Sequence, residues 1–426
     1  MTLIDLGDVA EPAERPGAGP VNFLRAARLT LAALSVVGLL ALTSSAAPAP
    51  SLVRPLWTAD FRPGDAMALD AATVYLDRTA PVGPREVTAY DLRTGAVKWS
   101  TPAGVRMSDR GVRKAGDVLL VPTEASGGAG TTALDAATGD LLWRLNGVAA
   151  PSVGSDDVVL AETDKSGATT GLRLVGLRDG RQVWKRATAP AEQWITLAEG
   201  GRPTSILTVT SSGETTVYGY ADGAERQHAR IPWNGVYAST LFPAGPYPVV
   251  VRTASAQTVA TIYDSADLRP LWRSDETVGY VTGCGSLICV AGASGVTARE
   301  PATGRVLWQR PDAHFVWDLG GGRMLLSAVA NLASATTALV DAATGVTIGH
   351  SFGGQQAFSA DRAGSLLLLR GAGTSPDRTV LHRLDLTTGR QTPLGAVERF
   401  DEQDCQGTGG FLLCPRGETL TVAAVG

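Results

Sequence analysis

The chain has 426 residues, a formal net charge of −4 and 50 glycines. Its charges are scattered and form no basic patch, which argues against a nucleic-acid-binding protein. The glycines lie between short runs of β-branched residues, a composition that predicts many tight turns joining short strands. A chain of this length would ordinarily hold two or three domains, unless it is built from repeats.

Residues 29–47 form a long uncharged apolar segment, LTLAALSVVGLLALTSSAA. As a helix this segment would span roughly 28 Å, about one bilayer core. Arg25 and Arg28 precede it, and the positive-inside rule then places the N-terminus in the cytoplasm. We therefore expect a transmembrane signal-anchor helix over residues 25–47, with the following chain outside the cell membrane. The small residues of SSAAPAP leave a cleaved signal peptide as the alternative.

The segments that flank this helix are short. Residues 1–24 are predicted to be a disordered cytoplasmic tail, because the first twenty are polar, acidic and interrupted by Pro and Gly. Residues 3–8, LIDLGD, are the apolar stretch of this tail, and a docking peptide for a cytoplasmic partner is the alternative interpretation. Residues 48–51 are predicted to be a linker.

A short phrase then recurs along the chain, as in ALDAATGDLLW at residues 133–143 and AREPATGRVLW at residues 298–308. Aligned on its central turn, the phrase recurs every 36 to 45 residues, which is typical of a propeller. The copies of the turn are residues 91–95, 135–139, 176–180, 219–223, 264–268, 300–304, 341–345 and 385–389.

The phrase predicts a strand, a turn and a second strand. An Asp opens the turn by bonding its own downstream backbone, and a Gly supplies the positive φ that closes it. In five copies a Trp follows the last turn residue by four positions, so that the rings share one strand face and can pack on the neighbouring unit. These are Trp99, Trp143, Trp184, Trp272 and Trp308, whereas Gln227, Gly349 and Pro393 take that position in the other copies.

Two further strands fit into each interval, and four antiparallel strands in about 42 residues make one propeller blade. The chain ends on two middle strands, GFLLCPRG and ETLTVAAVG, without a final Trp strand. Residues 52–59 supply such a strand, with Trp57, but no turn before it. We therefore predict an all-β fold: a single propeller of eight or nine four-stranded blades over residues 52–426. Its terminal strands pair to close the ring, and one transmembrane helix precedes it.

The four cysteines fall in two of these units. Cys289 and Cys414 take equivalent places in a second strand, and Cys284 and Cys405 lie at the end of the strand before. This placement favours the disulfides Cys284–Cys289 and Cys405–Cys414 among the three possible pairings, each worth about 2–3 kcal/mol. Disulfides fit an oxidising compartment. The alternatives are buried free thiols or a metal site, although the spacings do not suit paired zinc ligands.

No catalytic motif stands out, and we expect no catalytic residue, metal or cofactor. The segment DAATGD at residues 135–140 lacks the alternating ligands of a calcium loop and is interpreted as a turn. Residues 401–404, DEQD, are interpreted as a solvated loop, with a cation or partner site as the alternative. The histidines lie far apart in sequence and are expected to be surface or satisfied residues, although a propeller axis could bring them together: His228, His314, His350 and His382.

The recurring phrase resembles the tryptophan-docking motif of pyrroloquinoline-quinone-like (PQQ-like) repeat propellers, over essentially all of residues 52–426. That superfamily includes quinoprotein dehydrogenases, outer-membrane assembly scaffold lipoproteins and the sensor domains of bacterial kinases, so the resemblance implies a fold rather than one function. Its dehydrogenases use a vicinal cysteine disulfide, a calcium site and a catalytic aspartate. This chain has no adjacent cysteines, and no aspartate can be matched to the catalytic one.

These observations favour a non-catalytic, membrane-anchored, extracytoplasmic propeller that binds a protein partner or ligand at the outer face of the membrane. One alternative is a quinone-dependent dehydrogenase. The other is an extracytoplasmic sensor that signals through its single helix, for which the chain offers no cytoplasmic kinase domain.

Overall fold

The structure is a computed structural model. It describes residues 31, 52–79, 85–104, 111–125, 128–152, 154–254, 257–328, 336–359, 364–371, 378–398 and 405–426. Contacts divide the chain into residues 1–50 and a compact unit of residues 51–426. The predicted tail, membrane helix and linker lie, apart from Leu31, outside the described residues. Among the residues described, no helix is long and apolar enough to span a bilayer.

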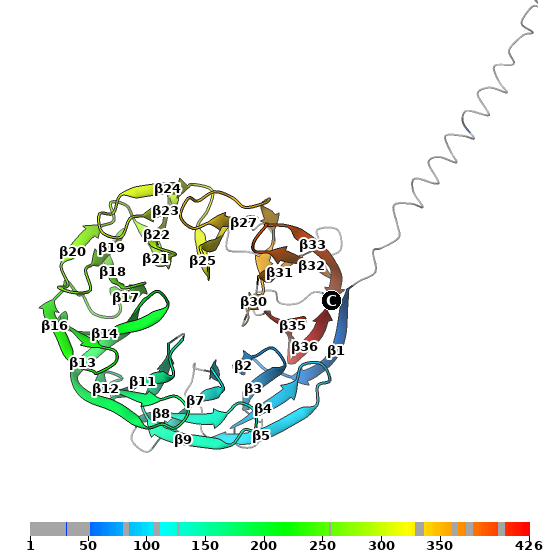
Figure 1. The fold of residues 1–426 in the computed structure, drawn as a ribbon, viewed down its shortest axis with the longest axis horizontal. Helices are drawn as coiled ribbons and strands as arrows, with labels where there is room; N and C mark the ends of the chain where they lie inside the picture. The colour runs from blue at the N-terminus through cyan, green and yellow to red at the C-terminus, as the bar shows by residue number, and fades with distance from the viewer. Residues whose placement is uncertain are drawn as a thin grey trace, which may run out of the picture. The chain divides into compact units, whose positions relative to one another are not determined.

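The described part of residues 51–426 consists of β-strands in eight hydrogen-bonded sheets, arranged around a ring (Figure 1). Six sheets have four antiparallel strands each. Three of them are β2 (Ala66–Leu69), β3 (Thr73–Thr79), β4 (Arg85–Asp91) and β5 (Val97–Gly104); β6 (Arg113–Ala115), β7 (Val118–Ala125), β8 (Gly128–Asp135) and β9 (Leu141–Asn146); and β17 (Ser239–Ala244), β18 (Tyr247–Ala254), β19 (Gln257–Tyr263) and β20 (Pro270–Arg273).

The other three four-stranded sheets lie later in the chain. They are β21 (Val278–Cys284), β22 (Leu287–Gly292), β23 (Gly295–Arg299) and β24 (Val306–Arg310); β25 (Phe315–Gly320), β26 (Arg323–Ser327), β27 (Thr336–Asp341) and β28 (Phe352–Gly353); and β29 (Gln355–Gln356), β31 (Ser365–Gly371), β32 (Arg378–Asp385) and β33 (Gln391–Glu398).

One sheet has seven strands because a single long strand belongs to two units. The 18-residue strand β13 pairs with β12 through its first half and with β14 through its second half. No turn interrupts β13, so the chain passes from one unit to the next as continuous strand. The seven strands are β10 (Val148–Pro151), β11 (Asp157–Thr163), β12 (Thr169–Gly176), β13 (Gln182–Glu199), β14 (Arg202–Thr210), β15 (Glu214–Gly219) and β16 (Glu225–Arg230).

The last sheet joins the two ends of the unit and is called the closing sheet. Strand β1 pairs antiparallel with β36, with Val53 opposite Val425 and Trp57 opposite Val422. The predicted pairing of the terminal strands is therefore confirmed. A second link was not predicted: β30, which follows β29 of the preceding sheet, pairs in parallel with β34. The order across the closing sheet is β1 (Val53–Asp60), β36 (Thr419–Val425), β35 (Phe411–Arg416), β34 (Gln406–Thr408) and β30 (Phe358–Ser359).

The hydrophobic core is divided among the interfaces between neighbouring sheets. In β11, Val158 and Leu160 pack in one core layer while Val159 and Ala161 pack in the next. Alternate side chains point to opposite faces of a strand, so both faces of this sheet are covered by its neighbours. This double burial explains why the strands appear in the sequence as continuous apolar runs.

The recurring turns have the predicted geometry. The carboxylate of Asp91 accepts hydrogen bonds from the amides of Arg93 and Thr94, and the amide of Gly95 donates to the Asp91 carbonyl at 2.9 Å. Gly95 has a φ of 71°, in the left-handed region. The Thr94 hydroxyl also donates to the Asp91 carboxylate, at 2.9 Å, a contact that was not predicted.

Candidate functional site

Six tryptophans connect neighbouring units through one repeated contact. The Trp143 indole Nε1 donates to the carbonyl of Leu177 at 3.0 Å, and its ring lies against Gly180 of the same turn. A Cβ at Gly180 would lie 2.7 Å from Trp143 Cγ, which leaves room only for glycine. The other five pairs of indole donor and carbonyl acceptor are Trp57–Leu92, Trp99–Ala136, Trp184–Tyr220, Trp272–Pro301 and Trp308–Ala342.

Three units depart from this contact. Gln227 replaces the tryptophan in one of them, and the turn opposite ends on Leu268 instead of glycine. At Gly349 the ring is absent and the backbones touch, since a Cβ on Gly349 would lie 2.6 Å from the Gly389 carbonyl oxygen. Pro393 lies in β33, where the amide of Leu52 donates to the neighbouring Leu394 carbonyl at 2.7 Å.

The cysteines form the two predicted disulfides, Cys284–Cys289 and Cys405–Cys414. Their placement differs in one respect from the prediction. Cys284 ends strand β21 as expected, but Cys405 precedes β34 rather than ending a first strand. Strand β34 is only three residues long and begins after the cysteine. The two disulfides therefore cross-link their hairpins at different positions relative to the first strand. Among the described residues no cysteine is free.

The histidines form no common site in the described part of the chain. His228 bonds Thr216 and Glu214 on an exposed strand surface. Burial and then the charge of Arg370 lower the pKa of His382. Asp135 is the turn carboxylate, which accepts from the amides of Ala137 and Thr138. No group of three His, Cys, Asp or Glu among the described residues could hold a metal ion, and residues 401–404 lie outside them.

A hollow of about 520 Å³, the Trp194 pocket, lies where β13 crosses between two units. Two lining side chains of β13 form hydrogen bonds with later residues of the chain. Gln193 accepts from the amide of Leu241 at 2.7 Å, and Glu192 accepts from the Trp233 indole at 2.8 Å. Its apolar lining includes Trp194, Val148, Val236 and Leu241.

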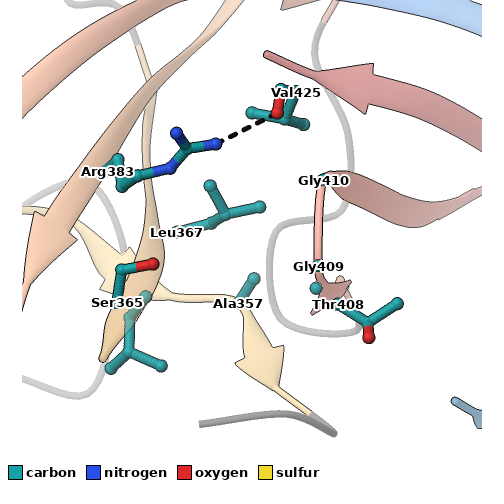
Figure 2. Close-up of a pocket in the computed structure, with 10 residues that line it drawn as sticks. Ala357, Ser365, Leu367, Arg383, Thr408, Gly409, Gly410 and Val425 are labelled. Atoms are coloured by element: carbon teal, nitrogen blue, oxygen red, sulfur yellow. Dashed lines mark hydrogen bonds between the residues drawn. The ribbon is translucent and has the colours of Figure 1, made fainter. Parts of the chain in front are cut away.

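A smaller cavity of about 110 Å³, the closing-sheet cavity, lies between β31 and β32 on one side and β34 to β36 on the other (Figure 2). Arg383 lines it and donates from Nη2 to the carbonyl of Val425 at 3.0 Å. The glycine-rich segment Gly407–Gly410 forms the opposite wall, so backbone lies close to the space. The lining combines polar and apolar groups: Ser365, Arg383 and Thr408, and Ala357, Leu366, Leu367 and Val425.

A buried ion pair lies within one sheet, and its arginine also bonds to the next sheet. The side chains of Asp77 and Arg85 are 0% and 2% exposed and form a two-pronged contact within one sheet. Arg85 Nη1 also donates to the carbonyl of Pro122 in β7 of the next sheet. This pair was not predicted from the sequence. Asp77, a charged residue directly after the apolar residues 74–76 of β3, was its visible signal.

The strand order, the glycine-closed turns and the repeated indole contact define the tryptophan-docked class of repeat β-propellers. A family model described as outer membrane protein assembly factor BamB matches residues 53–196, 83–234 and 168–391. Because these matches cover well over half of the chain, the protein belongs to this family of PQQ-like repeat propellers. A comparison with curated proteins finds no significant match.

Several solved structures are similar to this chain. BamB from Moraxella catarrhalis is 16% identical, with 87% of this chain and 97% of that chain covered, and a TM-score of 0.38. A europium-containing methanol dehydrogenase is 12% identical, with 88% and 93% covered and a TM-score of 0.43. The computationally designed protein Ika8 is 13% identical, with 87% and 98% covered and a TM-score of 0.46.

Proposed function

We propose that this protein is a non-catalytic, protein-binding propeller, anchored in the cell membrane by residues 29–47 and exposed on the outer side. Membership of the BamB family supports a scaffold role. The uncharged apolar run and the arginines before it, Arg25 and Arg28, support the anchor and its orientation. The two disulfides fit an oxidising compartment outside the cytoplasm.

The propeller in this proposal has nine blades. Strand β13 belongs to two units, so the seven-stranded sheet counts as two four-stranded blades. The six four-stranded sheets and the closing sheet supply the other seven. This count agrees with the nine tryptophan-equivalent positions, from Trp57 to Pro393. Strand β30 is then an extra inner strand on the closing blade.

The Trp194 pocket and the loop at its edge are the observation that carries the binding proposal. Val236 lines the pocket, and the side chain of the next residue, Tyr237, is fully exposed. The loop is held by hydrogen bonds, from Asn234 N to Ser239 Oγ at 2.9 Å and from Ser239 N to Gly235 O at 2.8 Å. An exposed tyrosine on a fixed loop beside an aromatic-lined hollow is typical of the centre of a protein interface.

The proposal includes the absence of quinone chemistry. The family's dehydrogenases bind their cofactor beside a disulfide between adjacent cysteines, whereas the nearest two cysteines here, Cys284 and Cys289, are five residues apart. Each disulfide lies within one hairpin of one sheet and cross-links that hairpin.

Site-directed photo-crosslinking in native membranes tests the binding proposal. A photoreactive benzoylphenylalanine in place of Tyr237 is expected to capture one defined protein. The same group in place of Val346, which is 63% exposed at another turn, is the control and should capture none. Capture at Tyr237 should also be lost in the Trp194→Ala background. Equal capture at both positions, or none at Tyr237, would contradict the proposal.

A further inference from the structure

The Arg383 guanidinium in the closing-sheet cavity has unused hydrogen-bonding capacity. An arginine has five N–H donors, and within the part of the chain that the structure describes Arg383 uses one of them, on the Val425 carbonyl. Among the described residues it forms no ion pair with an Asp or Glu. A half-buried cation without a counter-ion is unfavourable, because burial removes water that would otherwise stabilise the charge. The cavity therefore favours the entry of an anionic group.

Two hydroxyl groups also line the cavity, and one of them has no hydrogen-bond partner in the described part of the chain. Thr408 is 3% exposed, and its Oγ1 is buried without a hydrogen bond. Ser365 on β31 is half-buried and also lines the cavity. Buried polar atoms in proteins are nearly always hydrogen-bonded, so an orphaned hydroxyl points to water or a ligand that completes it. Figure 2 shows Ser365 and Arg383 on one side of the cavity and Gly409, Gly410 and Val425 on the other.

The size and lining of the cavity define the class of anion. A volume of about 110 Å³ is several times what a single water molecule requires, so the cavity has room for a small carboxylate such as acetate or propionate. One guanidinium balances one negative charge, and its planar fork matches a carboxylate in two-pronged geometry. Ala357 and Leu367 supply an apolar surface for the carbon end. A doubly charged phosphate would lack a second cation in this lining.

We propose that the closing-sheet cavity binds a small monocarboxylate through Arg383, with Ser365 as an additional donor. The site lies between the last four-stranded sheet and the closing sheet, so its occupant touches both sides of the junction that completes the ring. A ligand that binds the folded state alone stabilises it in proportion to the logarithm of its concentration. Carboxylate binding therefore strengthens ring closure, independently of any protein partner.

Thermal unfolding of the full chain, followed by tryptophan fluorescence, tests this site with sodium acetate and sodium propionate as probes. Sodium chloride at equal ionic strength is the reference. In the wild type, the unfolding midpoint is expected to rise above the chloride reference as carboxylate is added. Arg383→Gln should weaken carboxylate affinity at least tenfold. Arg181→Gln, at an exposed position between β12 and β13, is the matched control and should leave the affinity unchanged.

Two outcomes would overturn the proposal: a midpoint in acetate and propionate that equals the chloride reference, or an equal rise in wild type and Arg383→Gln. If Arg383→Gln does not fold, carboxylate affinity is measured in Ser365→Ala instead. This variant keeps the Arg383–Val425 bond and removes one donor from the cavity. A several-fold loss of affinity in Ser365→Ala supports the site, and unchanged affinity refutes it. Neither result depends on the Trp194 pocket, so failure here leaves the protein-binding proposal to its own test.

Discussion

Gln227 and Leu268 replace, at a single interface, the tryptophan and the glycine that meet at six others. At those six, a Cβ on the turn glycine would lie 2.5 to 2.7 Å from a ring atom. Opposite Gln227 there is no ring, and Leu268 holds the same left-handed backbone at a φ of 56°. Its side chain is buried and packs with Trp233 and Leu241. At the six other interfaces, the glycine is therefore required by the tryptophan ring that lies against it as well as by the backbone conformation of the turn.

A double-mutant cycle at these two positions tests this relationship. Gln227→Trp alone is expected to destabilise the fold, because the new ring would meet the Leu268 side chain. Leu268→Gly alone should also destabilise it, through loss of a buried leucine. The double variant should be more stable than the sum of the two losses by about 1 kcal/mol or more, within the usual range for contacting residues. Strict additivity in urea unfolding would contradict the pairing of ring and glycine.

The indole contact of Trp143 should contribute strongly to stability. Trp143 is 7% exposed and spans the interface between two sheets. Trp143→Ala is expected to lower the free energy of unfolding by about 3–5 kcal/mol, as for other buried aromatic side chains. Leu141→Ala, two residues earlier on the same strand but 56% exposed, is the control and should change it by under about 0.5 kcal/mol. A loss below 1 kcal/mol for Trp143→Ala would rule out its docking role.

The closing strand β1 should be needed for a stable ring. Deletion of residues 52–59 removes most of the ladder to β36 and exposes the edge of that strand. Unfolding should then begin at a markedly lower temperature, and those amides of β36 that bond to β1 should lose their protection from hydrogen exchange. Deletion of residues 1–24, which leaves β1 in place, serves as the control. Closure by β1 would be wrong if the two deletions unfolded alike.

The buried pair of Asp77 and Arg85 predicts an asymmetric response to mutation. Asp77→Leu leaves the Arg85 charge buried without its partner and should cost about 3–5 kcal/mol. The double variant Asp77→Leu, Arg85→Met removes both charges and should recover much of this loss, since apolar replacements of buried pairs are often tolerated. Chemical denaturation of the three proteins measures the effect. A double variant less stable than Asp77→Leu would contradict it.

The turn carboxylates should make stability depend on acid pH. The hydroxyl of Thr94, and then its amide, lower the pKa of Asp91 from the usual 3.8. A folded-state pKa below the unfolded one stabilises the protein above the unfolded pKa, and this contribution is lost as the pH falls through the folded pKa. The stability difference between wild type and Asp91→Asn should therefore be full at pH 6 and shrink below about pH 4. A difference that stays constant down to pH 2 would exclude this origin.

The local and repeated features of the fold were predictable from the sequence. The turn at Asp91–Gly95 and the tryptophan four residues later recur often enough to reveal strand, turn and spacing. The unmatched strand around Trp57 revealed the closure. Thr94, Thr344 and Thr388, each directly before a turn glycine, were equally visible but were not recognised as hydrogen-bonding partners of the Asp that opens the turn.

Contacts without a repeated signature could not be predicted in this way. The parallel pairing of β30 with β34 and the continuous strand β13 each occur once, so no comparison among repeats reveals them. The Trp194 pocket follows from that single crossing strand. The closing-sheet cavity joins Arg383 to Val425, which are 42 residues apart. Such sites depend on how irregular units meet, and only the three-dimensional arrangement brings their residues together.

Native mass spectrometry of the protein, purified from its own membranes in mild detergent, tests the central claim most directly. A non-catalytic scaffold with two disulfides predicts a chain about four hydrogens lighter than the reduced polypeptide. It should carry no quinone-sized molecule and should form a stoichiometric complex with a second protein. A chain that retains a quinone-sized cofactor or a tightly held calcium ion, with no protein partner, would contradict the account and favour the dehydrogenase.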